Sequence, residues 1–471
     1  MKIAAIAAVF MAPLLRAAER PNVLFIAVDD LRPWLGCCEV GLKASPNIDR
    51  LAASGRLFSR HYAQVPTCGA SRCALMFGRY PGRLPGDVGN EAIQKTAAKQ
   101  PHPSLPGLFR NNGYRTISVG KITHYPGGRS GKGWKDGPEE LPGAWDVCTM
   151  PVGPWKTPEA AMHGYASGVP RAKGGMKSPL TEFIAGDDKT YPDGWIAEEA
   201  VARLSEALAV GKPFFLAAGF IKPHLPFVAP QSYRKEAESF EVPQLKASAK
   251  PEFPTTWHPG TEFRQYVFNE GDPFQSAEAT ESYRRAYLAC IRYMDAQVGK
   301  LLEALDHSAA AKNTVVVLWS DHGWLHGEHG IWGKHCLFEE ALRSPLIIRV
   351  PGQKEAGAKS DQIVETIDLF PTLAGLAGIP APKTMDGKSL EPVLSDPGAD
   401  LDGVAIGAWQ DKLTIRNDRF RMIVSRKDPS YVELYDHRVD PMETSNVGTD
   451  HPGEAASLRK TLSERTTVEG P

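Results

Sequence analysis

The segment VLFIAVDD, residues 23–30, gives the first indication of the fold class of this chain of 471 residues. Its apolar residues run without interruption up to an Asp-Asp pair, which is typical of a strand buried on both faces of a parallel sheet. Ser45 and Pro46 then open a predicted helix that continues to Ala53, because Ser favours the position before a helix and Pro its first turn. A strand followed by a helix is the repeating unit of an α/β fold.

This alternation continues along the chain. Apolar runs predict further strands, and a long amphipathic helix is indicated by apolar residues at helical spacing, such as Tyr287, Ile291, Met294 and Val298. We therefore expect an α/β sandwich with a large, mostly parallel sheet flanked by helices. The predicted strands are Tyr114–Val119, Phe214–Gly219, Thr314–Trp319 and Leu346–Val350, and the predicted helices are Trp195–Leu208 and Ala279–Leu305.

The pattern of the sequence changes after about residue 395. Short apolar segments follow one another closely there, which predicts a small antiparallel-sheet subdomain. We expect a main domain over residues 18–395 and this subdomain over residues 396–471. Residues 122–192 and 236–275 predict long loops that shape a pocket. The short predicted strands are residues 404–409, 413–416, 420–424 and 432–435.

The first 17 residues, MKIAAIAAVFMAPLLRA, have the pattern of a signal peptide. Lys2 precedes an apolar run from Ile3 to Leu15, and small residues follow at Ala17 and Ala18. A short anchor or a first core helix are the alternatives, but the run is too short to span a bilayer. We expect residues 1–17 to be removed, the protein to be periplasmic or secreted, and no stable membrane span in the rest of the chain.

The composition excludes several classes of protein. Lys and Arg number 54 and Asp and Glu 55, and this net charge of −1 argues against a nucleic-acid binder. With 42% hydrophobic and 23% charged residues, the chain is not a disordered tail. The seven cysteines are too few for a disulfide scaffold, and their odd number leaves at least one thiol unpaired.

Two predicted strands end in residues that bind metal ions. Asp29 and Asp30 follow the first strand, and Asp321 and His322 follow the strand at Thr314–Trp319. Ligands bind beyond the carboxyl ends of strands in an open α/β sheet, and carboxylate oxygens suit Ca²⁺ or Mg²⁺. Aspartate after a strand also caps turns and helices. Either pair alone is explained by capping, whereas the two together favour a metal site.

Cys68 lies at the start of a predicted short helix, Ser71–Phe77. A helix N-terminus activates a thiol, whereas a lone cysteine is more often a buried structural residue. The spacing is informative, since Ala70 follows two positions after Cys68 and Arg72 four positions after it.

The segment Cys68-Gly69-Ala70-Ser71-Arg72 resembles the Cys/Ser-x-Pro/Ala-x-Arg signature of the sulfatase family, which has an alkaline-phosphatase-like fold. Other segments resemble the family in the same order along the chain, so the resemblance covers nearly all of residues 18–471. These segments are Pro21 to Leu31, Ser45 to Leu51, Gly78 to Pro81, Glu433 to Asp436, Asp440-Pro441 and Glu443-Thr444.

A more specific resemblance is to the iduronate-2-sulfatase branch of this family. Two residues separate Lys121 from His124, where arylsulfatases typically have one. The segment from Lys222 to Phe227 is similar to the Lys-Pro-His-x-Pro-Phe motif of the branch, and His322 follows Asp321 where many sulfatases have Asn. The third block of the resemblance is Asp321-His322-Gly323-Trp324, Gly327-Glu328-His329-Gly330 and Lys334-His335.

The resemblance implies a nucleophile and a metal. Cys68 would be oxidised to formylglycine by a maturation enzyme, and its hydrate would supply a geminal diol. A divalent cation would lower the pKa of one hydroxyl and polarise the sulfate. We expect Ca²⁺, with Mg²⁺ open because a nitrogen ligand is unusual for calcium. The implied metal ligands are Asp29, Asp30, Asp321, His322 and the modified Cys68.

The resemblance also implies roles in the cleavage of a sulfate ester. Lys121 and Lys334 would bind sulfate oxygens, and Arg72 would orient the diol. His224 would protonate the departing sugar oxygen. His124 would take the second proton of the diol, so that sulfate leaves and the aldehyde is restored.

Simpler interpretations stand beside these roles. Lysines are mostly solvated surface residues, and His224 between two prolines has a structural reading as a loop residue. Trp324 and Trp332 either stack on a sugar or pack in the core, and we favour packing. Three further histidines either line the pocket or orient ligands: His326, His329 and His335.

The leading hypothesis is an exported sulfatase that acts on a sulfated carbohydrate, with a role in polysaccharide degradation. The runner-up is a phosphonate or phosphate ester hydrolase of the same superfamily. A third hypothesis is a catalytically inactive member that binds glycans and keeps Cys68 unmodified.

Overall fold

An eight-stranded sheet lies at the centre of the computed structural model, in the order β12-β2-β11-β8-β1-β6-β3-β4. Its strand pairs are parallel except that β11 runs antiparallel to β8 and β2. The predicted α/β sandwich with a large, mostly parallel sheet is confirmed. The strands are β1 (Asn22–Val28), β2 (Arg56–Tyr62), β3 (Arg115–Gly120), β4 (Val147–Thr149), β6 (Phe214–Phe220), β8 (Thr314–Ser320), β11 (Leu346–Arg349) and β12 (Lys359–Glu365).

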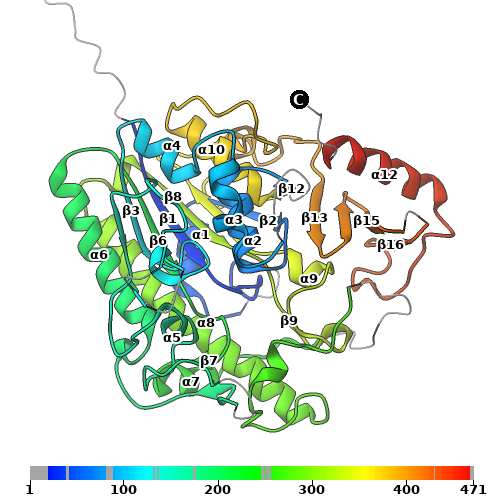
Figure 1. Ribbon diagram of the computed structural model, residues 1–471, viewed down its shortest axis with the longest axis horizontal. Coiled ribbons are helices and arrows are strands. Elements are labelled where there is room, and N and C mark those ends of the chain that lie inside the picture. The colour runs from blue at the N-terminus through cyan, green and yellow to red at the C-terminus, as the bar shows by residue number, and fades with distance from the viewer. Residues whose placement is uncertain are drawn as a thin grey trace, which may run out of the picture.

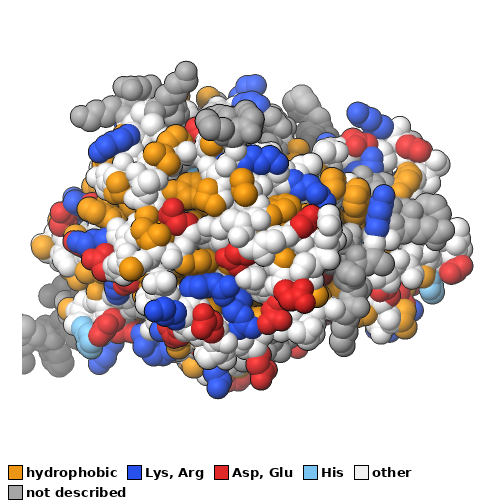
Figure 2. All heavy atoms as spheres, turned by 90° about the horizontal axis from the view of Figure 1, so that it is seen from below, with side chains coloured by type: hydrophobic (Ala, Val, Ile, Leu, Met, Phe, Trp, Pro, Cys, Tyr) orange, Lys and Arg blue, Asp and Glu red, His pale blue; other side chains and the backbone are white. Residues whose placement is uncertain are grey.

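The structure describes residues 20–38, 42–80, 88–130, 133–134, 137–172, 177–245, 250, 256–428 and 430–466. The predicted signal peptide, residues 1–17, therefore lies outside the described residues. Among the helices of the described segments, none is long and apolar enough to cross a bilayer. Figure 2 shows basic and acidic side chains intermixed on one face of the molecule, in line with the net charge of −1.

Helices cover both faces of the sheet because successive side chains of a strand point to opposite sides. Leu24 and Ile26 of β1 pack into one core with α1, α6 and α8, and Phe25 and Ala27 pack into another with α2, α4 and α10. Burial on both faces explains the unbroken apolar run of β1. The helices, seen in Figure 1, are α1 (Pro46–Ala53), α2 (Cys68–Phe77), α4 (Leu105–Asn111), α6 (Pro192–Val210), α8 (Ala277–Asp306) and α10 (Leu369–Leu376).

A second, four-stranded antiparallel sheet follows in the C-terminal part of the chain, in the order β13-β14-β15-β16. The predicted small antiparallel subdomain is thereby confirmed, while its boundary at residue 395 stays a prediction. Helix α12 (Pro452–Thr466), which the sequence analysis missed, lies beside this sheet in Figure 1 and buries Leu458 and Leu462. The strands are β13 (Ala405–Trp409), β14 (Lys412–Arg416), β15 (Phe420–Ser425) and β16 (Val432–Asp436).

Strands β2 and β12 were not predicted, because both carry charged residues that hide the strand pattern. Arg56 of β2 is buried and donates from Nη1 to the carbonyl oxygen of Ala358 at 3.1 Å and from Nε to that of Val393 at 3.2 Å. Helix α2 begins at Cys68, three residues before the predicted start.

The described residues between positions 122 and 191 form loops with short regular pieces, as predicted. Short elements in and around the loops of the molecule are α3 (Ala92–Thr96), α5 (Pro158–His163), α7 (Gln231–Ala237), α9 (Glu339–Leu342), α11 (Glu391–Ser395), β5 (Thr181–Glu182), β7 (Phe227–Val228), β9 (Leu325–His326) and β10 (Trp332–Gly333).

Candidate active site

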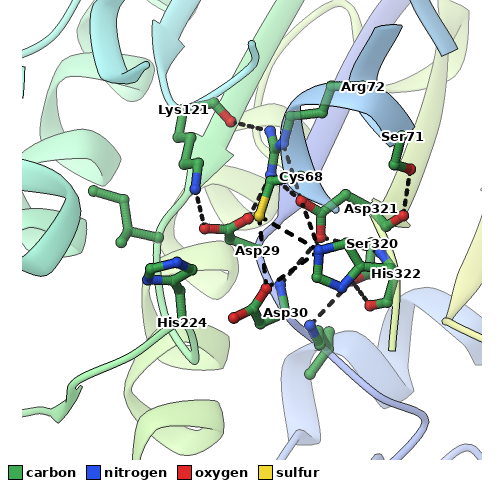
Figure 3. A network of polar contacts seen from close by, with 12 residues as sticks. Asp29, Asp30, Cys68, Ser71, Arg72, Lys121, His224, Ser320, Asp321 and His322 are labelled. Atoms are coloured by element: carbon green, nitrogen blue, oxygen red, sulfur yellow. Dashed lines mark hydrogen bonds and ion pairs between the residues drawn. The ribbon is translucent and has the colours of Figure 1, made fainter. Parts of the chain in front are cut away.

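The functional side chains predicted from the sequence meet where four neighbouring strands end, at the carboxyl ends of β8, β1, β6 and β3. This is the edge at which an open parallel sheet binds ligands. The N-terminus of α2 brings a further set of side chains to the same place, and the segment after β10 brings Lys334. The residues drawn together in Figure 3 include Asp29, Asp30, Cys68, Arg72, Lys121, His224, Asp321 and His322.

Arg72 connects the ends of three strands from a fully buried position. Its Nη2 lies 3.0 Å from Asp29 Oδ1, and its Nε donates to Asp321 Oδ2 at 3.0 Å. Its Nη1 donates to the carbonyl oxygens of Lys121 at 2.6 Å and Ile122 at 3.0 Å. A buried guanidinium needs such partners, so Arg72 fixes the carboxylates in place.

Lys121 and Lys334 are 0% and 3% exposed, so their interpretation as solvated surface lysines is wrong. Lys121 Nζ donates to Asp29 Oδ2, and Lys334 Nζ lies 2.8 Å from Asp30 Oδ1. Burial alone would raise the pKa of Asp29, but Lys121, His224 and Arg72 hold it well below its ordinary value. Asp29 is therefore charged.

Asp30 adopts a left-handed backbone conformation with φ of 58°, which costs free energy in a residue other than glycine. Tyr287 Oη donates to the Asp30 carbonyl oxygen at 2.8 Å and accepts from the Arg32 amide at 2.9 Å. These bonds hold the turn that points the carboxylate into the site. Burial, together with the charges of Asp29 and Asp321, raises the pKa of Asp30 to about 8 against the opposing effect of Lys334.

The Cys68 thiol lies at the centre of this set. Its Sγ is 3.2 Å from Lys334 Nζ, 3.4 Å from His322 Nε2 and 3.8 Å from Asp30 Oδ1. Burial and then the charge of Asp29 raise its pKa well above the ordinary value. The helix N-terminus therefore does not produce a thiolate here, and the unmodified cysteine is a poor nucleophile.

The orientation of two histidines follows from their neighbours. His322 Nδ1 donates to the Gly323 carbonyl oxygen at 2.9 Å, and His224 Nδ1 donates to the Leu225 carbonyl oxygen at 2.6 Å. Because a carbonyl only accepts, the proton of each neutral ring sits on Nδ1 and Nε2 stays free. The His322 Nε2 points at Cys68, and the His224 Nε2 lies 3.8 Å from Glu262 Oε1.

The loop that carries His224 is shaped by its own residues. Lys222 Nζ donates to the carbonyl oxygens of His224 at 2.7 Å and Pro226 at 2.8 Å, and Asp193 accepts from the amides of Ile221 and Lys222. The Lys222-Pro223 and Leu225-Pro226 peptide bonds are cis. The motif residues around His224 therefore build the loop.

A cavity of about 550 Å³ opens above Cys68. The predicted His124, His224 and Lys334 line it together with Cys68. The predicted pocket loops contribute as expected, since residues 122–192 and 236–275 supply much of the wall. The lining residues from those two segments are His124, Tyr125, Glu159, Met162, His163, Arg171, Thr261, Glu262 and Gln265. His224, which also lines the cavity, lies between the two segments in the sequence.

The donor set fits a divalent cation. Ligand atoms of Asp29, Asp30, Cys68 and His224 lie within 4.8 Å of one another, as do those of Cys68, Asp321 and His322. Within the described part of the chain, the buried Asp30 Oδ2 has no hydrogen-bond partner, and a buried unpaired carboxylate oxygen is costly. A cation at this position would satisfy it. The carboxylates favour Ca²⁺ or Mg²⁺.

The remaining residues of the third sequence block divide between packing and the cavity. Trp324 and Trp332 are buried, as expected for packing. His326 stacks on Trp34 with ring centroids 4.4 Å apart, and His329 stacks on Phe338 at 4.1 Å, whereas His335 lines the cavity.

All seven cysteines are free thiols. None of the six cysteines other than Cys68 therefore forms a disulfide bond in this structure.

Sequence reasoning missed two acidic residues of the site. Glu262 lines the cavity from within a loop that carries no motif. Glu140 accepts from the Thr123 hydroxyl at 2.5 Å and the Tyr125 amide at 2.9 Å, which positions the His124 segment. Burial raises the pKa of Glu140 to about 7. Neither residue has a sequence signal beyond its place in a predicted pocket loop.

With its α/β sandwich and with buried lysine, arginine and carboxylate side chains around a cavity suited to an anionic ester, the chain is an enzyme with an alkaline-phosphatase-like fold. The family model described as Sulfatase matches residues 21–379, and the chain belongs to the sulfatase family. It is therefore a sulfuric ester hydrolase. A model described as N-sulphoglucosamine sulphohydrolase, C-terminal, matches residues 327–468.

Similar proteins agree with this assignment. The chain is 33% identical to human iduronate 2-sulfatase over 399 residues, covering 77% of this chain and 70% of the relative. It is 31% identical to a sulfatase of Formosa agariphila over 451 residues, covering 92% of this chain and 83% of the relative. The solved structure of a phosphonate monoester hydrolase of Agrobacterium radiobacter is similar with a TM-score of 0.75 and 23% identity, covering 95% of each chain, which supports the fold.

Proposed function

We propose that this sulfatase is an exported enzyme that removes sulfate from a sulfated carbohydrate, in the manner of an iduronate 2-sulfatase. The observation that carries the proposal is the position of Lys334, whose Nζ lies 3.2 Å from Cys68 Sγ at the floor of the cavity. A fixed cation beside the reacting atom is what a sulfate ester requires. The human relative, by its name, acts on a sulfated sugar.

The proposed catalytic residues are Cys68, Arg72, Lys121, His124, His224 and Lys334, and the proposed metal ligands are Asp29, Asp30, Cys68, Asp321 and His322. Formylglycine at position 68, made by a maturation enzyme, would supply an oxygen nucleophile in its hydrated form, and Ca²⁺ or Mg²⁺ would supply a Lewis acid. The buried and neutral thiol of Cys68 supports this, because it needs modification to become reactive.

Two lysines would bind the sulfate oxygens. Lys121 and Lys334 reach the site from the end of β3 and from the segment after β10, so they approach Cys68 from different elements. Both remain charged despite burial, because Asp29 raises the pKa of Lys121 and Asp30 raises that of Lys334. Their charges then stabilise the negative charge on sulfate in the transition state.

Two histidines would transfer the protons. His224 presents Nε2 to the cavity and would protonate the departing sugar oxygen, and His124 would take a proton from the group at position 68. Burial lowers the pKa of both well below the ordinary value, with Lys121 acting in the same direction. Both rings are therefore neutral in the free enzyme, so His124 is ready to accept a proton, whereas His224 would have to take up a proton on Nε2 before it protonates the sugar oxygen.

A phosphonate or phosphate ester hydrolase is the second candidate, because the Agrobacterium radiobacter structure shares the fold. The deciding experiment compares kcat/KM on sulfate and phosphate esters of the same saccharide. We expect faster release of sulfate, and a faster phosphate reaction would overturn the proposal. Mass spectrometry of residues 61–72 from the exporting host gives the state of Cys68, and a thiol in all molecules would support the inactive glycan-binding alternative.

A further inference from the structure

Glu262 is the residue of the cavity that the proposed mechanism leaves unexplained. Its Oε1 lies 3.8 Å from His224 Nε2, and its Oε2 lies 3.7 Å from Lys334 Nζ. It therefore lies between His224, the proposed proton donor to the sugar oxygen, and Lys334, which is proposed to bind a sulfate oxygen. An acidic group at this place is unexpected in a site for an anionic ester, because it repels negative charge.

The loop that carries Glu262 is fixed to the Lys334 segment. Phe263, which follows it, is buried and stacks on Trp332 with ring centroids 4.9 Å apart. His258 Nε2 donates to the Lys334 carbonyl oxygen, and His258 Nδ1 accepts from the Gly260 amide at 3.0 Å. Gly260 has φ of 78°, and a Cβ there would lie 2.7 Å from the Trp332 carbonyl oxygen. This close approach keeps Glu262 in position before any substrate binds.

Glu262 has unused capacity to accept hydrogen bonds. Its side chain is 23% exposed and lines the cavity. Oε2 is buried beside Lys334 and lacks a hydrogen-bond partner in the described part of the chain, so Oε1 is the oxygen that a ligand in the cavity can reach. Burial would raise the pKa of Glu262, but Lys334, His335 and Arg171 hold it below its ordinary value, so the group is a carboxylate. A carboxylate accepts hydrogen bonds and donates none.

We propose that Glu262 determines substrate specificity by accepting a hydrogen bond from a free hydroxyl on the sugar carbon next to the one that carries the sulfate. The inference rests on the proposed function and deepens it by naming the substrate class. A hydroxyl donates to the carboxylate, whereas a second sulfate on that carbon would place negative charge against it in a partly buried site. The preferred sugar unit thus carries one sulfate with an unsubstituted neighbouring hydroxyl.

The test uses three matched forms of the best saccharide substrate, with wild-type enzyme whose Cys68 conversion has been verified. The neighbouring carbon carries a hydroxyl, a hydrogen or a second sulfate ester in the three forms. We expect kcat/KM for the hydroxyl form to exceed that for each of the others by at least about tenfold, because a site built to bind a hydroxyl discriminates strongly against its loss.

Two variants separate recognition from structural support. Glu262→Gln keeps the size and removes the charge, and we expect the preference over the disulfated form to fall by about tenfold. Glu262→Ala removes the acceptor, and we expect the preference for hydroxyl over hydrogen to disappear. Glu91→Gln is the matched control, because Glu91 also lines the cavity but is 52% exposed and pairs with Lys95, and both ratios should persist.

The outcomes distinguish this inference from the proposed function. If Glu262→Gln slows all three substrates equally, Glu262 only supports Lys334 and His224, and the inference is wrong while the sulfatase function stands. Equal values of kcat/KM for wild-type enzyme on the three forms would also contradict the inference about Glu262. Failure of the converted wild-type enzyme to release sulfate from any saccharide overturns both.

Discussion

The active site and the junction with the C-terminal sheet both bury carboxylates, arginine and histidine, but they use them differently. At the junction, the buried Arg421 donates to Glu339 Oε2 and Glu443 Oε1, each at 2.5 Å. Tyr62 donates to Glu339 Oε1 at 2.7 Å, and His437 Nε2 lies 2.8 Å from Glu443 Oε1. The ligand atoms of Glu339, His437 and Glu443 are as close together as those of the active site.

The difference lies in which atoms remain unsatisfied. Every carboxylate oxygen of Glu339 and Glu443 has a partner, since the last one, Glu443 Oε2, accepts from the Glu339 amide at 2.8 Å. In the active site, the buried Asp30 Oδ2 is without a hydrogen-bond partner among the described residues, and a cavity lies above Cys68. A satisfied cluster joins two sheets, whereas an unsatisfied cluster beside a cavity is prepared for a ligand. Four predictions test this contrast.

The largest expected effect distinguishes two buried cysteines of α2. Cys68→Ala should lower kcat/KM for sulfate release by roughly 10⁴-fold or more, because it removes the precursor of the nucleophile. Cys73→Ala is the control, since Cys73 is equally buried but contacts Thr96, with Sγ 3.3 Å from Oγ1. Steady-state kinetics on both variants is the measurement, and similar losses in the two would contradict the assignment of Cys68.

The second prediction concerns metal content. The purified enzyme should bind one divalent cation per chain, and its removal by a chelator should lower activity by about 10²-fold or more. Asp30→Asn should abolish binding, whereas Glu443→Gln should retain the ion, because Arg421 already occupies the junction cluster. Elemental analysis after gel filtration measures the stoichiometry. Loss of the ion in Glu443→Gln alone would place the metal at the junction.

The third prediction compares two buried arginines. Arg421→Met should lower the free energy of unfolding by about 3–5 kcal/mol, because it leaves two buried carboxylates without their counter-charge. The folded fraction should keep its kcat/KM, since Arg421 lies at the junction. Arg72→Met should lower kcat/KM as well, because Arg72 holds Asp29 and Asp321. Urea unfolding with parallel activity assays checks both, and an inactive folded Arg421→Met would contradict the contrast.

The smallest expected effect is a pH dependence of stability. Burial would raise the pKa of Glu443, but Arg421 and His437 lower it below its ordinary value in the folded state. The folded protein then binds fewer protons than the unfolded chain, so this stabilisation is present above about pH 4.5 and is lost as the pH falls. The effect is of the order of 1 kcal/mol. Urea unfolding measured between pH 6 and 4 should show that the free energy of unfolding depends less steeply on pH in Glu443→Gln than in the wild-type protein. An unchanged dependence on pH would exclude this contribution.

Several features of the site were predictable because they depend on local sequence. The apolar run of β1 and the strand before Asp321 identified two parallel strands, and their carboxyl ends indicated where the site lies. The predicted residues at positions 68 and 72 also reach that place. Other features depend on distant partners: β11 reverses direction, and Lys334 is buried because it meets Asp30.

The fold class, the edge of the sheet that carries the site and the residues that resemble a sulfatase could all be predicted from the amino-acid sequence. These follow from hydrophobic periodicity and from motifs whose members are close in the chain. Three features depend instead on how the chain folds in space: Lys121 and Lys334 are buried, Glu262 lies beside His224, and Arg421 joins the two sheets. They could not be predicted because burial and charge pairing depend on contacts between residues far apart in sequence, such as Tyr62 and Glu339.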